Sequence, residues 1–274
     1  MVEYLSVEKE ARRHNENLPG MGGVYNYVNL NVYHYGGNNP LKYVDPTGKD
    51  DIVISGGIAG YEKHKYQFIE KALKAIQDLK NKNNGETISW LVFNQGYSEK
   101  DIENFKKIAK EQGINFIAIN TKYEFINYLN CGNVNFSTSS IRQSSSRITD
   151  IYFFAHGYVN ELAFGHGGDL SLNFTLNDIT KFMPNAFNNQ SSIFYSCNTA
   201  TSKNNKSFAE IWFNKFGGSA TAFVGKTWYS DINTGNLLQE AWRQLYLNRE
   251  YGFNPFGSIN YPIADKGAYQ RVFY

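Results

Sequence analysis

Two short apolar runs, each ending at a chemically reactive residue, constrain the fold of this chain most strongly. The first run starts at Ile148 and ends at His156-Gly157, and the second starts at Ser191 and ends at Cys197. Short β-branched and aromatic runs bounded by polar residues are typical of buried strands. If the two strands are parallel neighbours, their carboxyl ends meet at one sheet edge, which is where open α/β sheets place their sites.

Strand-like and helix-like segments alternate from Asp51 onward. The patterns predict strands over 51–55, 87–93, 114–119, 148–155, 191–196 and 219–224. They predict helices over 62–80, 98–112, 122–130, 176–182, 206–216 and 235–248, with loops over 132–147 and between His156 and the helix at 176. Strands separated by helices imply an α/β fold with a mainly parallel sheet covered on both faces.

Composition limits the classes of function that the chain can serve. Its 274 residues allow one large domain or a domain with an appendage, and 42% hydrophobic with 19% charged residues suit a folded protein. A net charge of +2 provides no broad basic field for nucleic acid. The two cysteines, Cys131 and Cys197, are too few for a disulfide framework, so we expect free thiols and assign no role to Cys131.

No membrane span or signal peptide is expected. No apolar run is long enough to cross a bilayer, and the first ten residues are charged and lack an apolar core. We therefore expect synthesis in the cytoplasm. Export by a dedicated machine or as part of a larger chain stays open.

Residues 1–50 differ from the rest of the chain because they are rich in Gly, Asn and Tyr. Asn38-Asn39-Pro40 and Asp45-Pro46-Thr47-Gly48 are turn signals. Over about Leu18 to Gly48, the segment resembles the end of the Rhs/YD-repeat core domain. The resemblance implies that residues 1–50 are a remnant of that core and that residues 51–274 form a separate C-terminal domain. In that family such a domain is often a secreted toxin or effector, with an immunity protein as its partner. The alternative is that Asp45-Pro46 is only a turn and marks no domain junction.

His156 and Cys197 together have the chemistry of a cysteine nucleophile and its base. A free thiol is mostly protonated at neutral pH, so it needs a base or an ion-pair partner, which His156 can supply. Gly157 lets the chain turn sharply and leaves its N–H free to bind a developing oxyanion, together with the N–H of Cys197. A helix following Asn198 would favour the thiolate through its N-terminus.

The same residues carry a second resemblance, over about 148–231. The pattern is similar to that of clan CD cysteine peptidases such as caspases, legumains and gingipains, and to a caspase-like domain of bacterial surface proteins. The matching positions are His156-Gly157, Ala163-Phe164-Gly165, Tyr195-Ser196-Cys197-Asn198, Phe208-Ala209 and Gly217-Gly218. Ser196 departs from the acidic residue that many members have before the cysteine.

This resemblance implies the caspase/haemoglobinase fold, with a six-stranded sheet and helices on both faces. It also implies an endopeptidase with a His156–Cys197 dyad, a protein or peptide substrate and no cofactor. In clan CD peptidases the substrate-specificity pocket is built partly from the region that matches Gly225 to Asp231 of this chain. Trp228 would form a pocket wall, and Asp231 would pair with a basic substrate side chain. A core or lid aromatic and a loop cap are the favoured alternatives for these two residues.

Three alternatives remain open on sequence. His166 is a rival histidine in a Gly-rich loop, and His156, His166, Asp169 and Cys197 form a metal-ligand set without regular spacing. The same fold could serve as a catalytically inactive binding module, with the His–Cys pair vestigial. A toxin of another class, such as a nuclease, would need a basic groove that the composition does not suggest.

Overall fold

The computed structural model describes residues 49–57, 65–82, 86–134, 147–165, 170–202, 206–229 and 261–274. The Rhs-like segment and the helix expected over 235–248 lie outside these residues, as do His166, Asp169 and Asp231. The proposed boundary at residue 50 and the Rhs remnant therefore stay predictions.

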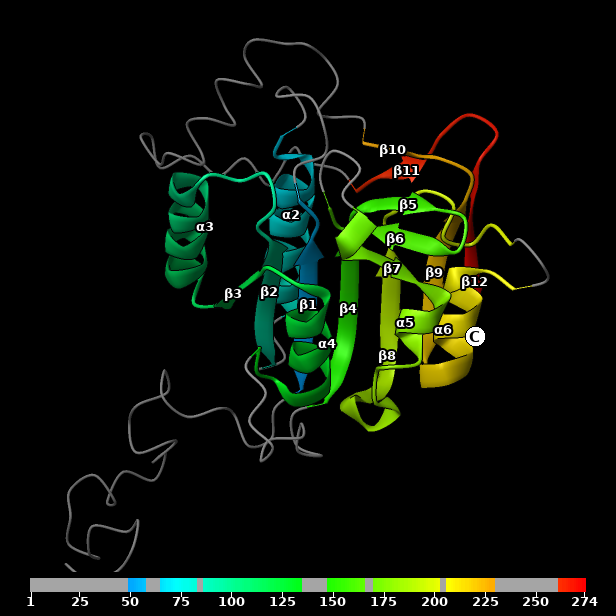
Figure 1. Ribbon diagram of the computed structural model, residues 1–274, viewed down its shortest axis with the longest axis horizontal. Helices are drawn as coiled ribbons and strands as arrows, with labels where there is room; N and C mark the ends of the chain where they lie inside the picture. Colours follow the sequence, from blue (N-terminus) through cyan, green and yellow to red (C-terminus); the bar gives the residue numbers. More distant parts are fainter. Residues whose placement is uncertain are drawn as a thin grey trace, which may run out of the picture. The chain divides into compact units, whose positions relative to one another are not determined.

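The centre of the domain is a seven-stranded sheet with the order β12-β9-β8-β4-β1-β2-β3 (Figure 1). Six strands are parallel neighbours, and β12 pairs antiparallel with β9 at one edge. The strands are β1 (Asp50–Ser55), β2 (Thr87–Phe93), β3 (Asn115–Ile119), β4 (Ile148–Phe154), β8 (Phe187–Phe194), β9 (Ser219–Val224) and β12 (Tyr269–Phe273).

The mainly parallel α/β sheet is confirmed, but the expected count of six strands is wrong. The strand that was missed, β12, reads Tyr-Gln-Arg-Val-Phe and buries only Phe273. Because an edge strand with one buried side chain lacks an apolar run, its pattern does not reveal it.

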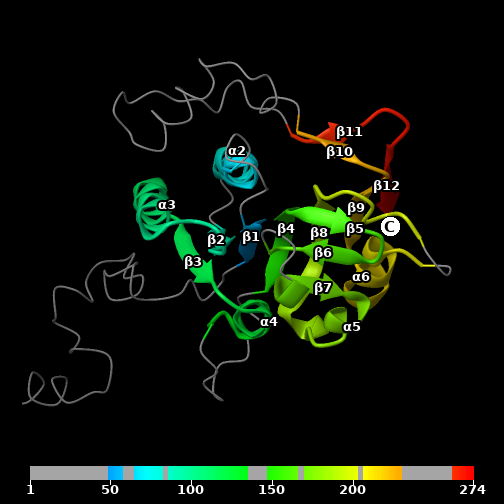
Figure 2. The ribbon, with the colours of Figure 1, turned by 45° about the horizontal axis from the view of Figure 1, so that its top comes forward.

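Helices cover both faces of the sheet, as the sequence predicts (Figure 2). On one face, α2 (Gln67–Lys82) and α3 (Glu99–Gln112) pack on Val53, Trp90 and Val92. On the other face, Ile52, Ile54, Leu91 and Phe93 meet side chains of three helices. These are α4 (Lys122–Cys131), α5 (Leu176–Ile179) and α6 (Phe208–Phe216). Consecutive strand residues point to opposite faces, so β1 contributes to both cores.

Two smaller sheets accompany the central one, and the first occupies the stretch after His156 where the sequence suggested a loop. The first is antiparallel and consists of β5 (His156–Tyr158), β6 (Glu161–Ala163) and β7 (Asn173–Thr175). The second pairs β10 (Thr227–Trp228) with β11 (Ile263–Ala264). The single turns η3 (Leu170–Leu172) and η4 (Pro184–Ala186) complete the described elements. Strands of two or three residues are too short for a period-2 pattern to show.

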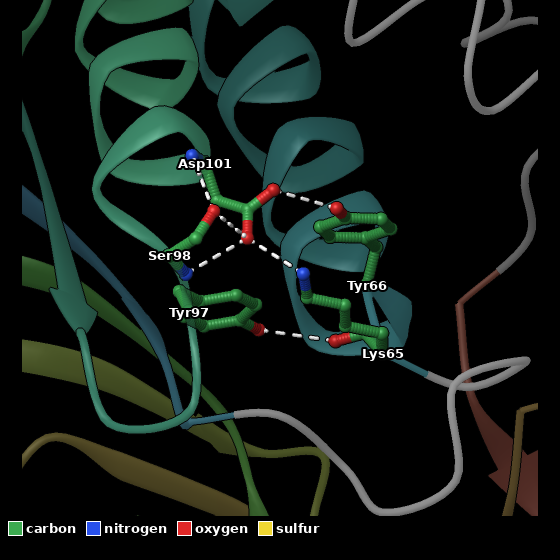
Figure 3. Close-up of polar contacts among 5 residues, drawn as sticks. All are labelled: Lys65, Tyr66, Tyr97, Ser98 and Asp101. Atoms are coloured by element: carbon green, nitrogen blue, oxygen red, sulfur yellow. Dashed lines mark hydrogen bonds and ion pairs between the residues drawn. The ribbon is translucent and has the colours of Figure 1, made fainter.

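The start of α3 is tied to the chain just before α2 through the Asp101 carboxylate (Figure 3). It accepts hydrogen bonds from Lys65 Nζ (2.6 Å) and the Tyr66 hydroxyl (2.6 Å). It also accepts from Ser98 N (2.9 Å) and Ser98 Oγ (2.8 Å), while the Asp101 N–H donates back to Ser98 Oγ. This capping box places the N-cap of α3 at Ser98, where the predicted helix over 98–112 begins. Burial opposes ionisation of Asp101, but these donors outweigh it and lower its pKa.

Replacing Asp101 should therefore cost stability in a pH-dependent way. The lowered pKa means that the ionised group stabilises the fold above the unfolded value of 3.8, and that this contribution is lost as pH falls below it. We expect Asp101→Asn to lose about 1–3 kcal/mol at pH 7 in urea unfolding, and to approach wild type below about pH 4. Glu103→Gln, an exposed acid on the same helix, is the control. Equal losses from both variants would contradict this account.

Asp51 should have the opposite pH dependence. Burial raises its pKa to about 7, and the negative charges of Asp150 and Glu86 add to the effect. The Asp51 carboxyl loses its proton near pH 4 in the unfolded chain and keeps it until about pH 7 in the folded chain. The free energy of unfolding therefore falls as pH rises from about 4 to about 7. One such group contributes a slope of at most about 1.4 kcal/mol per pH unit.

Asp51→Asn should remove this slope while leaving an acceptor for the Thr149 hydroxyl, which lies 3.1 Å from the Asp51 carboxylate. We expect the variant to match wild type in urea unfolding near pH 4 and to be the more stable protein at pH 8. Parallel stability profiles for the two proteins would refute the shifted pKa.

Candidate active site

His156 and Cys197 follow two strands that lie side by side. β4 and β8 are parallel neighbours, with Phe153 opposite Phe194. The pairing continues past the last paired residues, since Tyr195 N donates to Phe153 O at 2.9 Å. The segment after β4 then reaches His156, and the segment after β8 reaches Cys197, within a few positions at the carboxyl edge of the sheet. The expected juxtaposition of the two strand ends is confirmed.

Gly157 lies directly against the main chain of Cys197. A Cβ added at Gly157 would lie 2.0 Å from Cys197 O and 2.9 Å from Cys197 N. Gly157 is in β5, opposite Leu162, and its φ is not among the positive values. The sharp turn expected at this glycine is therefore wrong. The glycine is required because a side chain has no room beside Cys197.

The turn that follows Cys197 is fixed to the end of β9. Asn198 N donates to Gly225 O (2.7 Å), and Ala200 N donates to Phe223 O (2.9 Å). Gly225 N in turn donates to Thr201 Oγ1 (3.2 Å). Asn198 has a φ of 58°, a left-handed conformation that asparagine tolerates better than most residues. Three hydrogen bonds thus set where the turn after Cys197 lies relative to β9.

The expectation that a helix N-terminus acts on Cys197 is wrong. The turn after Cys197 is not helical, and α6 begins at Phe208 with Ser207 as its N-cap. The first-turn amide Ala209 N has no acceptor within the helix, and it donates to Thr199 O at 3.0 Å. Because a helix terminus acts within its first turn, α6 stabilises this loop and not the thiol.

Thr227 contacts the Cys197 sulfur, although the sequence analysis assigned it no role. Its main-chain N–H donates to Cys197 Sγ at 3.2 Å, and its hydroxyl oxygen lies 3.3 Å from the same sulfur. Cys197 itself is half-buried. A lone threonine in a two-residue strand has no sequence signature, so only the tertiary fold identifies it.

Aromatic side chains line the site next to His156. The imidazole packs edge-on against Phe68, with ring centroids 5.1 Å apart, and Phe68 also meets Tyr229 at 5.6 Å. The Tyr229 hydroxyl donates to the main-chain oxygen of Tyr195. Burial raises the pKa of Tyr229 well above its usual value, and negative charge at Cys197 adds to the rise.

Ser196 is buried, and its hydroxyl has no hydrogen-bond partner among the described residues. An ionised carboxylate at this position would be costly, because burying a charge without a partner is strongly unfavourable. The environment in this chain therefore suits a small neutral residue before the cysteine.

The two residues proposed to line a substrate pocket differ in outcome. Trp228 is 42% exposed in β10, opposite Ile263, which is 56% exposed, so the core-aromatic alternative for Trp228 is wrong. Asp231 lies outside the described residues, and its role stays a prediction.

Neither a metal centre nor a membrane helix is found in the described part of the chain. Its His, Cys, Asp and Glu side chains form no group of three that could hold a metal ion. The alternative ligand set is not tested, because it includes His166 and Asp169. Within the same residues, no helix combines the length and apolar character needed to span a bilayer.

Replacing Gly157 should disrupt the site more than replacing its neighbour at the same sheet edge, Gly56. We expect Gly157→Ala to lose at least about 2 kcal/mol in thermal or urea unfolding, and to slow alkylation of Cys197. A Cβ at Gly56 would meet Ala155 Cβ at 3.3 Å, so Gly56→Ala should have a small effect. Equal effects of the two variants would contradict the close approach of Gly157 to Cys197.

Comparison with known proteins agrees with this geometry. Residues 57–266 match the family model described as Peptidase family C25. No curated protein and no solved structure matches the chain significantly. The family match spans both strand ends and well over half of the sequence. The chain therefore belongs to peptidase family C25, a family of cysteine peptidases, and is a hydrolase.

Proposed function

We propose that this protein is an endopeptidase in which Cys197 is the nucleophile and His156 the general acid–base. The observation that carries the proposal is the close approach of Gly157 to the Cys197 main chain. It brings the residue next to His156 against the residue that bears the thiol. Membership of family C25 supplies the cysteine-peptidase class.

The chemistry proceeds in two steps. The Cys197 thiolate attacks the carbonyl carbon of the scissile peptide bond, the C–N bond breaks, and His156 gives a proton to the departing amine. A thioester then links the substrate's acyl part to Cys197. Water attacks this thioester while His156 takes its proton, and the C–S bond breaks to release a carboxylic acid and regenerate the thiolate.

The N–H groups of Gly157 and Cys197 are the proposed oxyanion donors. In the β5–β6 hairpin, Tyr158 is opposite Glu161 across a two-residue loop, and Gly157 is opposite Leu162. Hydrogen-bonded and non-hydrogen-bonded pairs alternate in an antiparallel ladder. If the loop-closing pair is hydrogen-bonded, the amide of Gly157 points away from β6. This supports a free donor at the place where the oxyanion of the tetrahedral intermediate develops.

A protein or peptide segment is the proposed substrate, and Trp228 with Ile263 is its proposed contact surface. Cross-strand partners present their side chains on one face, so these two exposed apolar residues form a pair. Trp228 immediately follows Thr227, which contacts the Cys197 sulfur. An apolar substrate side chain near the scissile bond would fit such a surface. Selection of a basic side chain by Asp231 is the separate proposal that the sequence suggests.

The biological setting that we propose is a toxin or effector role with an immunity protein as partner. Its support is the Asp45-Pro46-Thr47-Gly48 motif and the Rhs-like segment around it. The peptidase proposal does not depend on this setting.

Labelling with peptidyl acyloxymethyl ketones that vary at the residue before the warhead tests the peptidase proposal. On wild type we expect one adduct by intact mass, and we expect no adduct on Cys197→Ala. On His156→Ala the adduct should form at least about tenfold more slowly, because proton transfer by a general base is commonly worth about 10²–10⁴ in rate. Cys131→Ser, which removes the other thiol, should label like wild type. No adduct on folded wild type, or an adduct on Cys131 alone, would favour the inactive binding module.

A further inference from the structure

The sulfur of Cys197 has two polar neighbours on one residue of β10. Thr227 N lies 3.2 Å from the sulfur and donates to it, and Thr227 Oγ1 lies 3.3 Å from it. A main-chain N–H can only donate, so in this contact the sulfur is the acceptor. A thiolate is a stronger acceptor than a thiol, because hydrogen bonds to ionised groups are roughly twice as strong as neutral ones.

The placement of Thr227 is set by contacts independent of its side chain. Gly225, two residues earlier, accepts from Asn198 N and donates to Thr201 Oγ1, which fixes β10 relative to the turn after Cys197. On the other side, Thr227 pairs with Ala264 of β11, and Asp265 N donates to Lys226 O at 3.0 Å. Both polar groups of Thr227 that contact the sulfur therefore start from a main chain that is anchored on two sides.

We infer that Thr227 stabilises the Cys197 thiolate through its main-chain N–H and its hydroxyl. This inference rests on the proposed role of Cys197 as nucleophile. With the sulfur ionised, the hydroxyl proton of Thr227 turns toward it and the residue provides two donors. The thiolate is then supported by Thr227 as well as by His156, which also transfers the proton to the leaving amine. When the sulfur bonds to the substrate carbon, its charge moves to the carbonyl oxygen and this interaction weakens.

Two variants separate the hydroxyl from the shape of the side chain. Thr227→Val keeps the β-branched shape and the main-chain N–H but loses the hydroxyl. Thr227→Ser keeps the hydroxyl and loses a methyl group. Both are made in a Cys131→Ser background, so that Cys197 is the only thiol. Thermal unfolding first establishes that each variant is folded.

The measurement is the rate of alkylation of Cys197 by iodoacetamide across pH, read by intact mass. The midpoint of this profile reports the thiol pKa, and the reaction requires no peptidase activity. We expect the midpoint to rise by about one pH unit in Thr227→Val, as loss of one hydrogen bond to a charged group implies, and to stay near wild type in Thr227→Ser. At pH above both midpoints, Thr227→Val should react as fast as wild type or faster, because less stabilised thiolates are better nucleophiles.

An unchanged midpoint in folded Thr227→Val would overturn the inference, as would an equal shift in both variants, which would indicate packing rather than the hydroxyl. The outcome is distinguishable from that of the peptidyl-ketone labelling. A shifted alkylation profile together with no peptidyl adduct would support the role of Thr227 and refute the endopeptidase. A peptidyl adduct together with an unshifted alkylation profile would support the endopeptidase and refute the role of Thr227.

Discussion

The parallel pairing of β4 with β8 is the constraint on which the rest of the site depends. Two strands in this register deliver His156 and Cys197 to the same sheet edge, and the chain then closes the remaining gap by backbone contact. This backbone contact is possible only because residue 157 is glycine. A Cβ on its Cα would overlap the carbonyl oxygen of Cys197. Main-chain geometry thus brings the residue next to His156 against Cys197 before either side chain is considered.

The frame is held from both sides of the sheet and from its carboxyl edge. Helices on the two faces bury separate aromatic-rich cores, so the central strands cannot slip in register without moving their side chains between cores. At the edge, Asp101 ties the beginning of α3 to the residues before α2. The same stretch leads into Phe68, which packs against the imidazole of His156. The stretch of chain that Asp101 binds therefore also carries the ring that packs on the proposed base.

The sequence predicts the parallel sheet, its covering helices and the reactive strand ends because apolar runs bounded by polar residues, and helical periodicity between them, have strong local signatures. It misses what depends on tertiary contact. The strand β12 buries one side chain, β5 to β7 are three residues each, and Thr227 is an ordinary threonine until folding brings it to Cys197. Gly157 is expected from the sequence to provide a sharp turn, which is a local reason for glycine, whereas the structure gives a steric reason, because a Cβ would overlap the Cys197 carbonyl oxygen. The helix expected to act on Cys197 fails for a similar reason, because the turn after Cys197 docks on β9 instead of continuing into α6.

The pairing of β10 with β11 has a consequence for the order in which the enzyme matures. During synthesis His156 and Cys197 leave the ribosome well before Ile263 and Ala264, the residues that hold β10 in place. A nascent chain that already contains both His156 and Cys197 therefore lacks the strand that anchors Thr227 beside the sulfur. Assembly of the thiol's surroundings is then delayed until the later segment has folded back onto the domain. For an enzyme that cleaves proteins, such a delay would protect the chain and its neighbours while translation is under way.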